Sequence, residues 1–492
     1  TVLKDATATS IYGSRAANGV IVITTKHGSQ GKTKVNFTAK LGWESLPSYT
    51  NNYKLVNADQ NIELATEALL NSYKENGAGS TFGYNNETYN LGFTYDQKGA
   101  EDFYDSYTGG WLSNYRNAGK STNWMDEITR NGLIQEYGFD INSGAKEKTA
   151  PIFYLSYNHL GDESFMKAKD LKRHTLRFNL DQQPCKFVKY GINTSFSYTV
   201  TNNGAGGGYF SDPLTQVYMM NPMTGVYDEN GDFNFDTSTQ YNPVALRSKL
   251  GDKNEAKQYQ ATVSPYVQLN ILPGLTWMTK GGLDLYYVDE YEFWSFLNPQ
   301  GKSQNGYGAN SSNMRSLLTI TNTLNYIKTF GEKHHLNVLL GQEGQQTSIR
   351  REDMENSNFP VQNLGQLSLA SVPGSAKTYK FKLVQNSFFS NLQYDYDNKY
   401  YVSASFRTDG SSRFGKDHRW ASFWSVGAKY RITEEKFIEA AKSWLTDLTI
   451  RGSYGTTGNQ DVGDHTNADY LSWIVARDVF GYGYNYNGKP GS

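Results

Sequence analysis

The sequence has few cysteines, no long apolar run and no excess of positive charge, and each absence excludes a class of protein or site. It has one cysteine in 492 residues, Cys185, which excludes an intramolecular disulfide and a multi-cysteine metal site. No run approaches the roughly 18 to 20 apolar residues of a membrane-spanning helix, and the mean hydropathy is -0.64, which excludes a helical membrane protein. Lysine plus arginine is 47 and aspartate plus glutamate is 48, so no basic field attracts nucleic acid.

Proline is also scarce, whereas glycine and aromatic residues are abundant. The chain has 12 prolines against 47 glycines, 37 tyrosines, 25 phenylalanines and 9 tryptophans. Aromatic side chains favour β-strands, so the composition predicts a β-rich chain.

The clearest predicted strand covers residues 188–200 (VKYGINTSFSYTV), where apolar and polar side chains alternate with a period of two. The side chains of one face are mostly apolar: Val188, Tyr190, Ile192, Thr194, Phe196, Tyr198 and Val200. The opposite face carries small or polar residues such as Lys189, Asn193 and Ser195. Such a strand has one apolar face only.

The same alternation recurs in further segments and predicts about thirteen strands. The other twelve are expected at 35–43, 134–143, 151–160, 174–181, 262–271, 275–285, 316–330, 335–347, 387–396, 400–409, 420–431 and 447–456. Many have ten or more residues, whereas strands of soluble sheets typically have five or six.

The connections alternate between long and short, which indicates tight turns on one side of the sheet and large loops on the other. The long ones are expected at 45–133, 201–258, 289–315 and 348–386, with turns such as 182–187 and 331–334 between them. This rhythm, with long strands and one apolar face, is typical of an outer-membrane barrel. Tyr394, Tyr396, Tyr400 and Tyr401 bracket one turn, as an interfacial aromatic belt would. A β-sandwich also alternates, so alternation alone leaves that fold open.

The first residues read differently from the rest. Residues 1–12 predict a short helix that ends at Gly13, and Gly19 precedes a continuous apolar strand, VIVITTK, expected to be buried on both faces. A strand of that kind belongs to a compact unit, so we expect the end of a separate small domain before the first long strand.

This segment carries a resemblance to a known family. VLKDATATSIYGSRAANGVIVITTK resembles the end of the plug domain of SusC/RagA-like TonB-dependent outer-membrane transporters. Other segments are similar to the same family, including LKRHTLRFNLD and LTIRGSYGTTGNQDVG, and the similarity covers the chain nearly end to end. These family-like segments lie at 132–164, 171–181, 225–233, 399–438 and 448–463.

The resemblance implies an all-β fold: a transmembrane antiparallel β-barrel of about 22 strands, closed by a plug, of which this chain supplies about 13 to 14. Residues 1–30 would be the C-terminal end of the plug, and residues 31–492 the first and central barrel strands. We expect the TonB box, most of the plug and the last strands to lie outside this chain. The plug segment includes Tyr12, Gly13, Arg15, Asn18 and Gly19. Arg15 is expected to make a polar contact facing the lumen, or a structural ion pair.

The resemblance also implies a function. Such proteins import a large nutrient, an oligosaccharide or a peptide, across the outer membrane of a Gram-negative bacterium. Energy comes from the TonB–ExbB–ExbD complex, and a SusD-like surface lipoprotein acts as a lid. The remaining partner is outer-membrane lipid, and no enzymatic activity and no cofactor are implied. Siderophore or cobalamin receptors, and a secreted β-sandwich that binds or hydrolyses glycans, are the alternatives.

Residues that could carry chemistry or contact cargo are few. Aromatic rings stack on sugar faces, which makes Tyr209, Phe210, Tyr291 and Trp294 on the long loops candidate ligand contacts. His334 and His335 fall in a short turn without a third metal ligand, so no metal site is expected. In the loop after residue 407, Asp409 and Arg413 are expected to link neighbouring strands.

Overall fold

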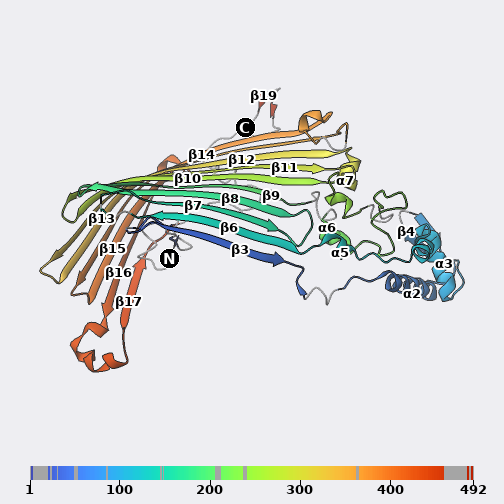
Figure 1. The fold of residues 1–492 in the computed structure, drawn as a ribbon, viewed down its shortest axis with the longest axis horizontal. Coiled ribbons are helices and arrows are strands. Elements are labelled where there is room, and N and C mark those ends of the chain that lie inside the picture. Colours follow the sequence, from blue (N-terminus) through green and yellow to red (C-terminus); the bar gives the residue numbers. More distant parts are fainter. Residues whose placement is uncertain are drawn as a thin grey trace.

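The computed structural model is dominated by one antiparallel sheet of thirteen strands, in which sequence neighbours pair throughout (Figure 1). The sheet order is β17-β16-β15-β14-β13-β12-β11-β10-β9-β8-β7-β6-β3. The structure describes residues 2–3, 20–22, 25–29, 31–48, 54–84, 87–144, 147, 149–204, 212–235, 241–361, 365–458, 485–486 and 489–490. The sheet is a section of the wall of a transmembrane-type β-barrel, as the sequence predicts.

All thirteen predicted strands are confirmed in the predicted order, but several of their ends were wrong. The strands are β3 Lys34–Glu44, β6 Gly132–Ser143, β7 Ile152–Glu163, β8 Asp170–Cys185, β9 Val188–Asn202, β10 Lys253–Leu272, β11 Leu275–Trp294, β12 Tyr307–Phe330, β13 His334–Ser357, β14 Val372–Tyr396, β15 Tyr400–Ser411, β16 Trp420–Arg431 and β17 Thr449–Gly455. Strands β11 to β14 continue through most of the segments expected as loops. Those loops shrink to 295–306 and 358–371.

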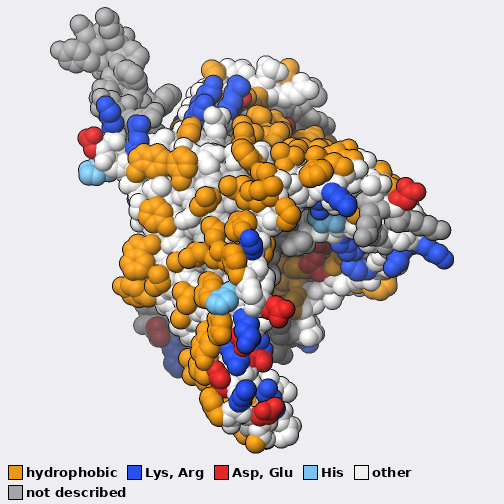
Figure 2. All heavy atoms as spheres, turned by 90° about the vertical axis from the view of Figure 1, so that its left-hand side faces the viewer, with side chains coloured by type: hydrophobic (Ala, Val, Ile, Leu, Met, Phe, Trp, Pro, Cys, Tyr) orange, Lys and Arg blue, Asp and Glu red, His pale blue; other side chains and the backbone are white. Residues whose placement is uncertain are grey.

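The two faces of the sheet differ in polarity and exposure. The outer face carries large apolar side chains in the open, for example Phe196 at 47%, Leu340 at 50% and Phe406 at 49% exposed. The interior face carries small polar side chains, of which Ser387 and Ser425 are each 1% exposed. Figure 2, which views the end with the tight turns, shows hydrophobic side chains over much of the visible surface. An apolar surface of this size is stable in contact with lipid or protein, not with water.

The turn end of the sheet uses the backbone conformations that tight hairpins require. Asp397 and Asn398 between β14 and β15 both have positive φ, 55° and 54°, as the type I′ turn needs. Gly274 between β10 and β11 has φ of +83°, and a Cβ there would collide with the carbonyl oxygen of Ile327. Only glycine fits that turn.

Helices gather at the opposite, loop end of the sheet, at the right of Figure 1. The first long loop holds α2 Ala58–Asn76, β4 Thr81–Tyr84, β5 Glu87–Asn90, α3 Gln97–Thr108, α4 Trp111–Ala118 and α5 Trp124–Ile128. Later connections at this end hold α6 Pro213–Val217, η4 Ala245–Arg247, α7 Pro299–Ser303, η5 Leu367–Leu369 and η6 Lys416–His418. The helical turns η7 Ile432–Glu434 and η8 Lys436–Ser443 lie instead between β16 and β17, at the turn end, and β18 Asn485–Tyr486 pairs with β19 Lys489–Pro490. Among the described residues, none of the helices has the length and apolar composition needed to cross a membrane.

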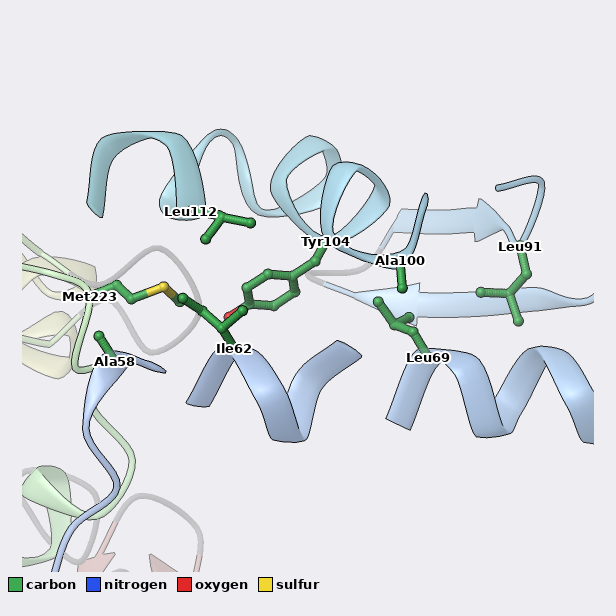
Figure 3. Packing of buried hydrophobic residues seen from close by; sticks show 8 residues of the cluster. All are labelled: Ala58, Ile62, Leu69, Leu91, Ala100, Tyr104, Leu112 and Met223. Carbon is green, nitrogen blue, oxygen red and sulfur yellow. The ribbon is translucent and has the colours of Figure 1, made fainter. Parts of the chain in front are cut away.

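The helices of the first long loop pack around a hydrophobic cluster to which Met223 of the loop before β10 also contributes (Figure 3). Helix α2 starts at a capping box between Asn57 and Gln60, and it buries Ile62 and Leu69 against Tyr104 of α3. Ala58, Leu91, Ala100, Leu112 and Met223 complete the cluster. This segment is therefore a small folded unit on the sheet.

The structure corrects two expectations at the N-terminus. Val2–Leu3 (β1) pairs antiparallel with Val20–Ile21 (β2), so the helix expected over residues 1–12 is wrong at residues 2 and 3. Ile21 is 72% exposed, so the burial expected for its strand is also wrong. Strand pairing explains the first difference, since two short strands in contact satisfy backbone groups that a helix would otherwise satisfy internally. The exposure of Ile21 shows that no described element packs over its side chain.

Candidate ligand-binding region

The interior face of the sheet forms a polar hollow of about 810 Å³ over strands β7 to β10. Its wall includes Asn158, Ser195, Ser197 and Gln260, with hydroxyl and amide groups from each strand. Arg173 and Arg177 also line it, and none of the described residues in its wall carries a carboxylate. The hollow offers many hydrogen-bonding groups, which suits a hydrated or polar cargo better than an apolar one.

A segment of the N-terminal region runs along this wall toward the turn end. The Asn179 side-chain amide donates to the backbone oxygen of Lys26 at 2.7 Å, and the backbone N–H of Ser29 donates to Asn142 Oδ1 at 3.0 Å. His27 Nδ1 lies 2.8 Å from Asp181 Oδ2. These contacts fix residues 26–29 to the interior of β6 and β8, where the end of a plug would enter.

At the loop end, Trp294 lies on the interior face and packs on Tyr307. The two residues face each other across β11 and β12, and their ring centroids are 4.3 Å apart. The Trp294 indole N–H donates to Glu292 Oε1 at 2.8 Å, and the Tyr307 hydroxyl donates to Glu355 Oε2 at 2.8 Å. The two rings, tilted by 34° to each other, and the two carboxylates beside them form a candidate rim site that sequence reasoning missed, since Tyr307 was assigned to a loop.

The structure separates Tyr291 from Trp294, although both were candidate ligand contacts. Tyr291 projects from the opposite face of β11, because successive side chains alternate along a strand. Its hydroxyl donates to the backbone oxygen of Gly365 at 2.7 Å, and Phe293 on the same face packs edge-on against Phe359 at 5.2 Å. Tyr291 thus anchors the loop 358–371.

A buried carboxylate joins two of the long loops. Asp252, 7% exposed, accepts hydrogen bonds from the Ser295 backbone N–H at 2.7 Å and from the Asn298 side-chain amide at 2.6 Å. Burial raises the pKa of Asp252 to about 6, against the opposing effect of these hydrogen bonds. The loop before β10 is therefore linked to the loop after β11 by a group that titrates under mild conditions.

An ion network lies on the interior face of β13 to β15. Arg407, 2% exposed, donates to Asp409 Oδ1 at 2.6 Å and contacts Glu343 at 3.4 Å. The centroid of the Phe389 ring lies 5.3 Å from the Arg407 guanidinium carbon, and the end of the ring lies over Gly341, where a Cβ would collide with it. Asp409 was expected, with Arg413, to link neighbouring strands; the structure pairs it with Arg407 of its own strand β15, because alternation places these two side chains on one face.

The remaining candidates lie outside the described residues or show no site. Tyr209 and Phe210, and the plug residues Tyr12, Gly13, Arg15, Asn18 and Gly19, lie outside the part of the chain that the structure describes. His334 and His335 begin β13, where they contact Tyr394 and Thr329. Within the described ranges, no three His, Cys, Asp or Glu side chains gather as metal ligands would.

Comparisons with known proteins identify what the chain is similar to. No family model matches it. The TonB-dependent receptor SusC of Bacteroides thetaiotaomicron is 26% identical over 494 residues, covering 94% of this chain and 43% of SusC. The TonB-dependent receptor P3 of Formosa agariphila is 26% identical over 490 residues, covering 96% of this chain and 43% of the receptor. The chain thus spans less than half the length of these relatives.

Solved structures share the fold. The structure of the RagAB peptide transporter superposes with a TM-score of 0.73 at 26% identity, covering 94% of this chain and 51% of that chain. The RagAB peptide importer in its closed-closed state superposes with a TM-score of 0.75 at 24% identity, with the same coverage. The chain is similar to SusC and to RagA-type receptors over nearly all its residues, as the sequence motifs predict.

Proposed function

We propose that this SusC/RagA-like chain forms part of a TonB-dependent importer that carries a large nutrient, an oligosaccharide or a peptide, across the outer membrane of a Gram-negative bacterium. The observation that carries the proposal is the thirteen-stranded sheet, with an exposed apolar outer face and a polar interior face. That arrangement is the one a plugged outer-membrane barrel requires.

Aromatic residues at both ends of the outer face support the membrane position. At the turn end, Tyr400 stacks between Tyr396 and Tyr430, at 6.5 and 5.1 Å. Trp420, stacked on Phe388 at 6.3 Å, lies about 10 residues from Tyr430 along β16. At about 3.3 Å per residue and a tilt of about 40°, this separation is about 25 Å along the barrel axis. A lipid-facing band of an outer-membrane barrel has about that height.

The cargo would enter at the loop end and move along the polar interior. Trp294 and Tyr307 provide a ring surface there, and Glu292 and Glu355 provide acceptors for sugar hydroxyls or peptide N–H groups. We propose Trp294 as a ligand contact and Tyr291 as a loop anchor. Tyr209 and Phe210 stay predictions from the sequence.

The partners follow from the same proposal. A SusD-like surface lipoprotein would close the loop end, and the TonB–ExbB–ExbD complex would act through the plug from the periplasm. The contacts of residues 26–29 with the interior wall support a plug that enters at the turn end. Residues 1–30 would be the end of that plug and residues 31–492 barrel wall and loops. No bond is made or broken, so we propose a transporter and not an enzyme.

A siderophore or cobalamin receptor is the second candidate within the same architecture. The polar hollow, with Arg173 and Arg177 and no carboxylate among the described residues of its lining, would also admit a small anionic chelate. The two candidate functions differ in the size of the cargo: an oligosaccharide or peptide importer takes up a large molecule, and a siderophore or cobalamin receptor a smaller one.

The decisive experiment measures uptake by cells that express the wild-type protein or a variant. We expect fluorescent oligosaccharides or peptides to enter, and Trp294→Ala to lower their binding about tenfold, the effect of losing about 1.4 kcal/mol of stacking. Tyr287→Ala removes an aromatic ring from the opposite, outer face of the same strand and is the matched control, with binding unchanged. Uptake of ferric siderophores alone would favour the second candidate, and a soluble protein without heat-modifiable migration would contradict both.

A further inference from the structure

Three cationic side chains stand together on the outer face of β13 and β14, near the loop end. They are Arg350, Lys380 and Lys382. Lys380 and Lys382 share the face of Val384 and Phe388, which are 44% and 48% exposed, because residues two apart on a strand point the same way. The patch of Arg350, Lys380 and Lys382, here called the basic patch, therefore faces away from the interior.

The pairing of the strands places like charges opposite each other. Arg350 is the direct partner of Lys380, and Lys382 is the partner of Ser348. Directly opposed residues have Cβ atoms about 5 Å apart, where like charges are destabilising. One carboxylate reduces the repulsion between these charges, because Glu352 accepts a hydrogen bond from Arg350 Nε at 2.9 Å. Among the described residues, no carboxylate lies within 4.0 Å of the Lys380 or Lys382 ammonium group.

The basic patch lies at the height of lipid headgroups. Lys382 is about 14 residues from Tyr396, which marks the turn end of the apolar band. This distance is about 46 Å along the strand, or about 35 Å along the barrel axis, against a band of about 25 Å. Lys382 is thus about 10 Å beyond the apolar band, and its flexible stem can lie along apolar surface while the ammonium group meets the headgroups.

Neighbouring side chains complete a surface suited to a headgroup. Ser348 and Ser316 are direct partners on the same face and supply hydroxyl donors beside Lys382. Met314, 46% exposed, pairs with Arg350 and with Tyr287 and lies level with the upper part of the basic patch, and Val384, 44% exposed, offers apolar surface next to Lys382 toward the band. Cations, hydroxyls and an apolar border are the components that bind a phosphate attached to acyl chains.

We propose that the basic patch binds the phosphate of an anionic lipid headgroup in the outer leaflet. The inference rests on the proposed function, since it needs the outer face to be in a membrane. The bound phosphate offsets the like-charge repulsion between Arg350 and Lys380. Lys380 and Lys382 contribute most, because Glu352 already neutralises Arg350.

The test uses the protein purified from outer membranes and placed in phosphatidylcholine nanodiscs, with trace spin-labelled phosphatidylglycerol or phosphatidylcholine. Electron spin resonance measures the fraction of each labelled lipid that is immobilised on the protein. We expect phosphatidylglycerol to be preferred, and the double variant Lys380→Gln/Lys382→Gln to lose about 30-fold in affinity, equivalent to about 2 kcal/mol at about 1.4 kcal/mol per tenfold. Added salt should weaken the preference.

The matched control is Lys74→Gln/Lys120→Gln, which removes the same charge from exposed positions in the first long loop. It should keep the preference for phosphatidylglycerol. Heat-modifiable migration of each variant shows that its barrel is folded and inserted, so a loss of lipid binding is not a loss of structure. Equal immobilisation of both lipids by a folded wild-type protein overturns the basic-patch proposal and leaves the transporter proposal standing; a protein absent from the membrane overturns both.

Discussion

The side-chain amide of Asn298 donates a hydrogen bond of 2.6 Å to the buried carboxylate of Asp252 and thereby ties the loop after β11 to the loop before β10. Ser295 donates to the same carboxylate through its backbone N–H and through its hydroxyl, at 2.7 and 3.0 Å. Three donors converge on one group that has little contact with water. Its protonation therefore affects how firmly the two loops hold together.

The linkage between the loops should depend on pH through Asp252. Its pKa is about 6 in the folded protein and about 3.8 in an unfolded loop, so the folded loops bind a proton more tightly. Proton binding by Asp252 therefore stabilises the contact between the two loops. This contribution is fully present below about pH 4, falls by about 3 kcal/mol as the pH rises to about 6, and no longer changes above that pH. Hydrogen exchange of the Ser295 amide, corrected for the intrinsic effect of pH, measures this opening.

Asp252→Asn is the control for that titration, because the amide has the shape of the carboxyl group and does not ionise. The variant should show the same protection of the Ser295 amide at pH 4 and pH 7. A pH dependence that survives in Asp252→Asn would assign the effect to another group.

An arginine on the outer face should destabilise the barrel where it meets lipid. Phe196 is 47% exposed on the apolar face of β9, so Phe196→Arg should cost about 2 to 4 kcal/mol near the middle of the bilayer. Folding into vesicles, followed by urea titration and heat-modifiable migration, measures the loss. Ser197→Arg places the same charge in the polar hollow one residue away, opposite Thr175, and should cost far less. Equal losses would mean that the outer face does not contact lipid.

Breaking the interior ion network should be costly because its members are buried. Arg407 is 2% and Asp409 3% exposed, so Arg407→Leu leaves carboxylates without their cation and should cost about 3 to 5 kcal/mol. The same urea titration measures it. Lys98→Ala breaks a pair on helix α3 whose side chains are 81% and 63% exposed, and no measurable loss is expected. A loss at Lys98 as large as that at Arg407 would contradict the role of burial.

The helical unit of the first long loop should unfold without the sheet. Leu69 is 4% exposed in the cluster, so Leu69→Ala should lower the local stability of the helical unit by about 2 to 5 kcal/mol. Leu64 on the same helix is 55% exposed, and Leu64→Ala should change stability by less than about 0.5 kcal/mol. Limited proteolysis between residues 54 and 131 reports the local loss, while heat-modifiable migration of the barrel should stay unchanged in both.

The sequence predicts the strands well where one face meets an apolar environment and the other a polar one. The prediction fails on the loop side of the apolar band of the outer face, because both faces of a strand are polar there and the alternation disappears. The stretch RREDMENS at the end of β13 is hydrophilic except for Met354 and was assigned to a loop, yet it pairs with β12 and β14 up to Ser357. Pairing partners, not hydropathy, keep these residues extended.

The candidate site was predictable only in part, for the same reason. Trp294 and Tyr291 were chosen as loop aromatics, whereas both lie on β11 and on opposite faces. The Trp294 and Tyr307 pair depends on the register between β11 and β12, and the position of Asp252 depends on contacts between distant loops. Helix α3, by contrast, had a readable signal: Asp96 caps its start, Gly109 its end, and Ala100 and Tyr104 mark its buried stripe.

Gly341 has a consequence for the free width of the barrel interior. Because Gly341 has no side chain, the end of the Phe389 ring can occupy the space over the directly opposite position of β13. A methyl group at position 341 would collide with that ring and force it to move. Under the proposed importer function, position 341 would therefore influence the width of the interior without contacting the cargo.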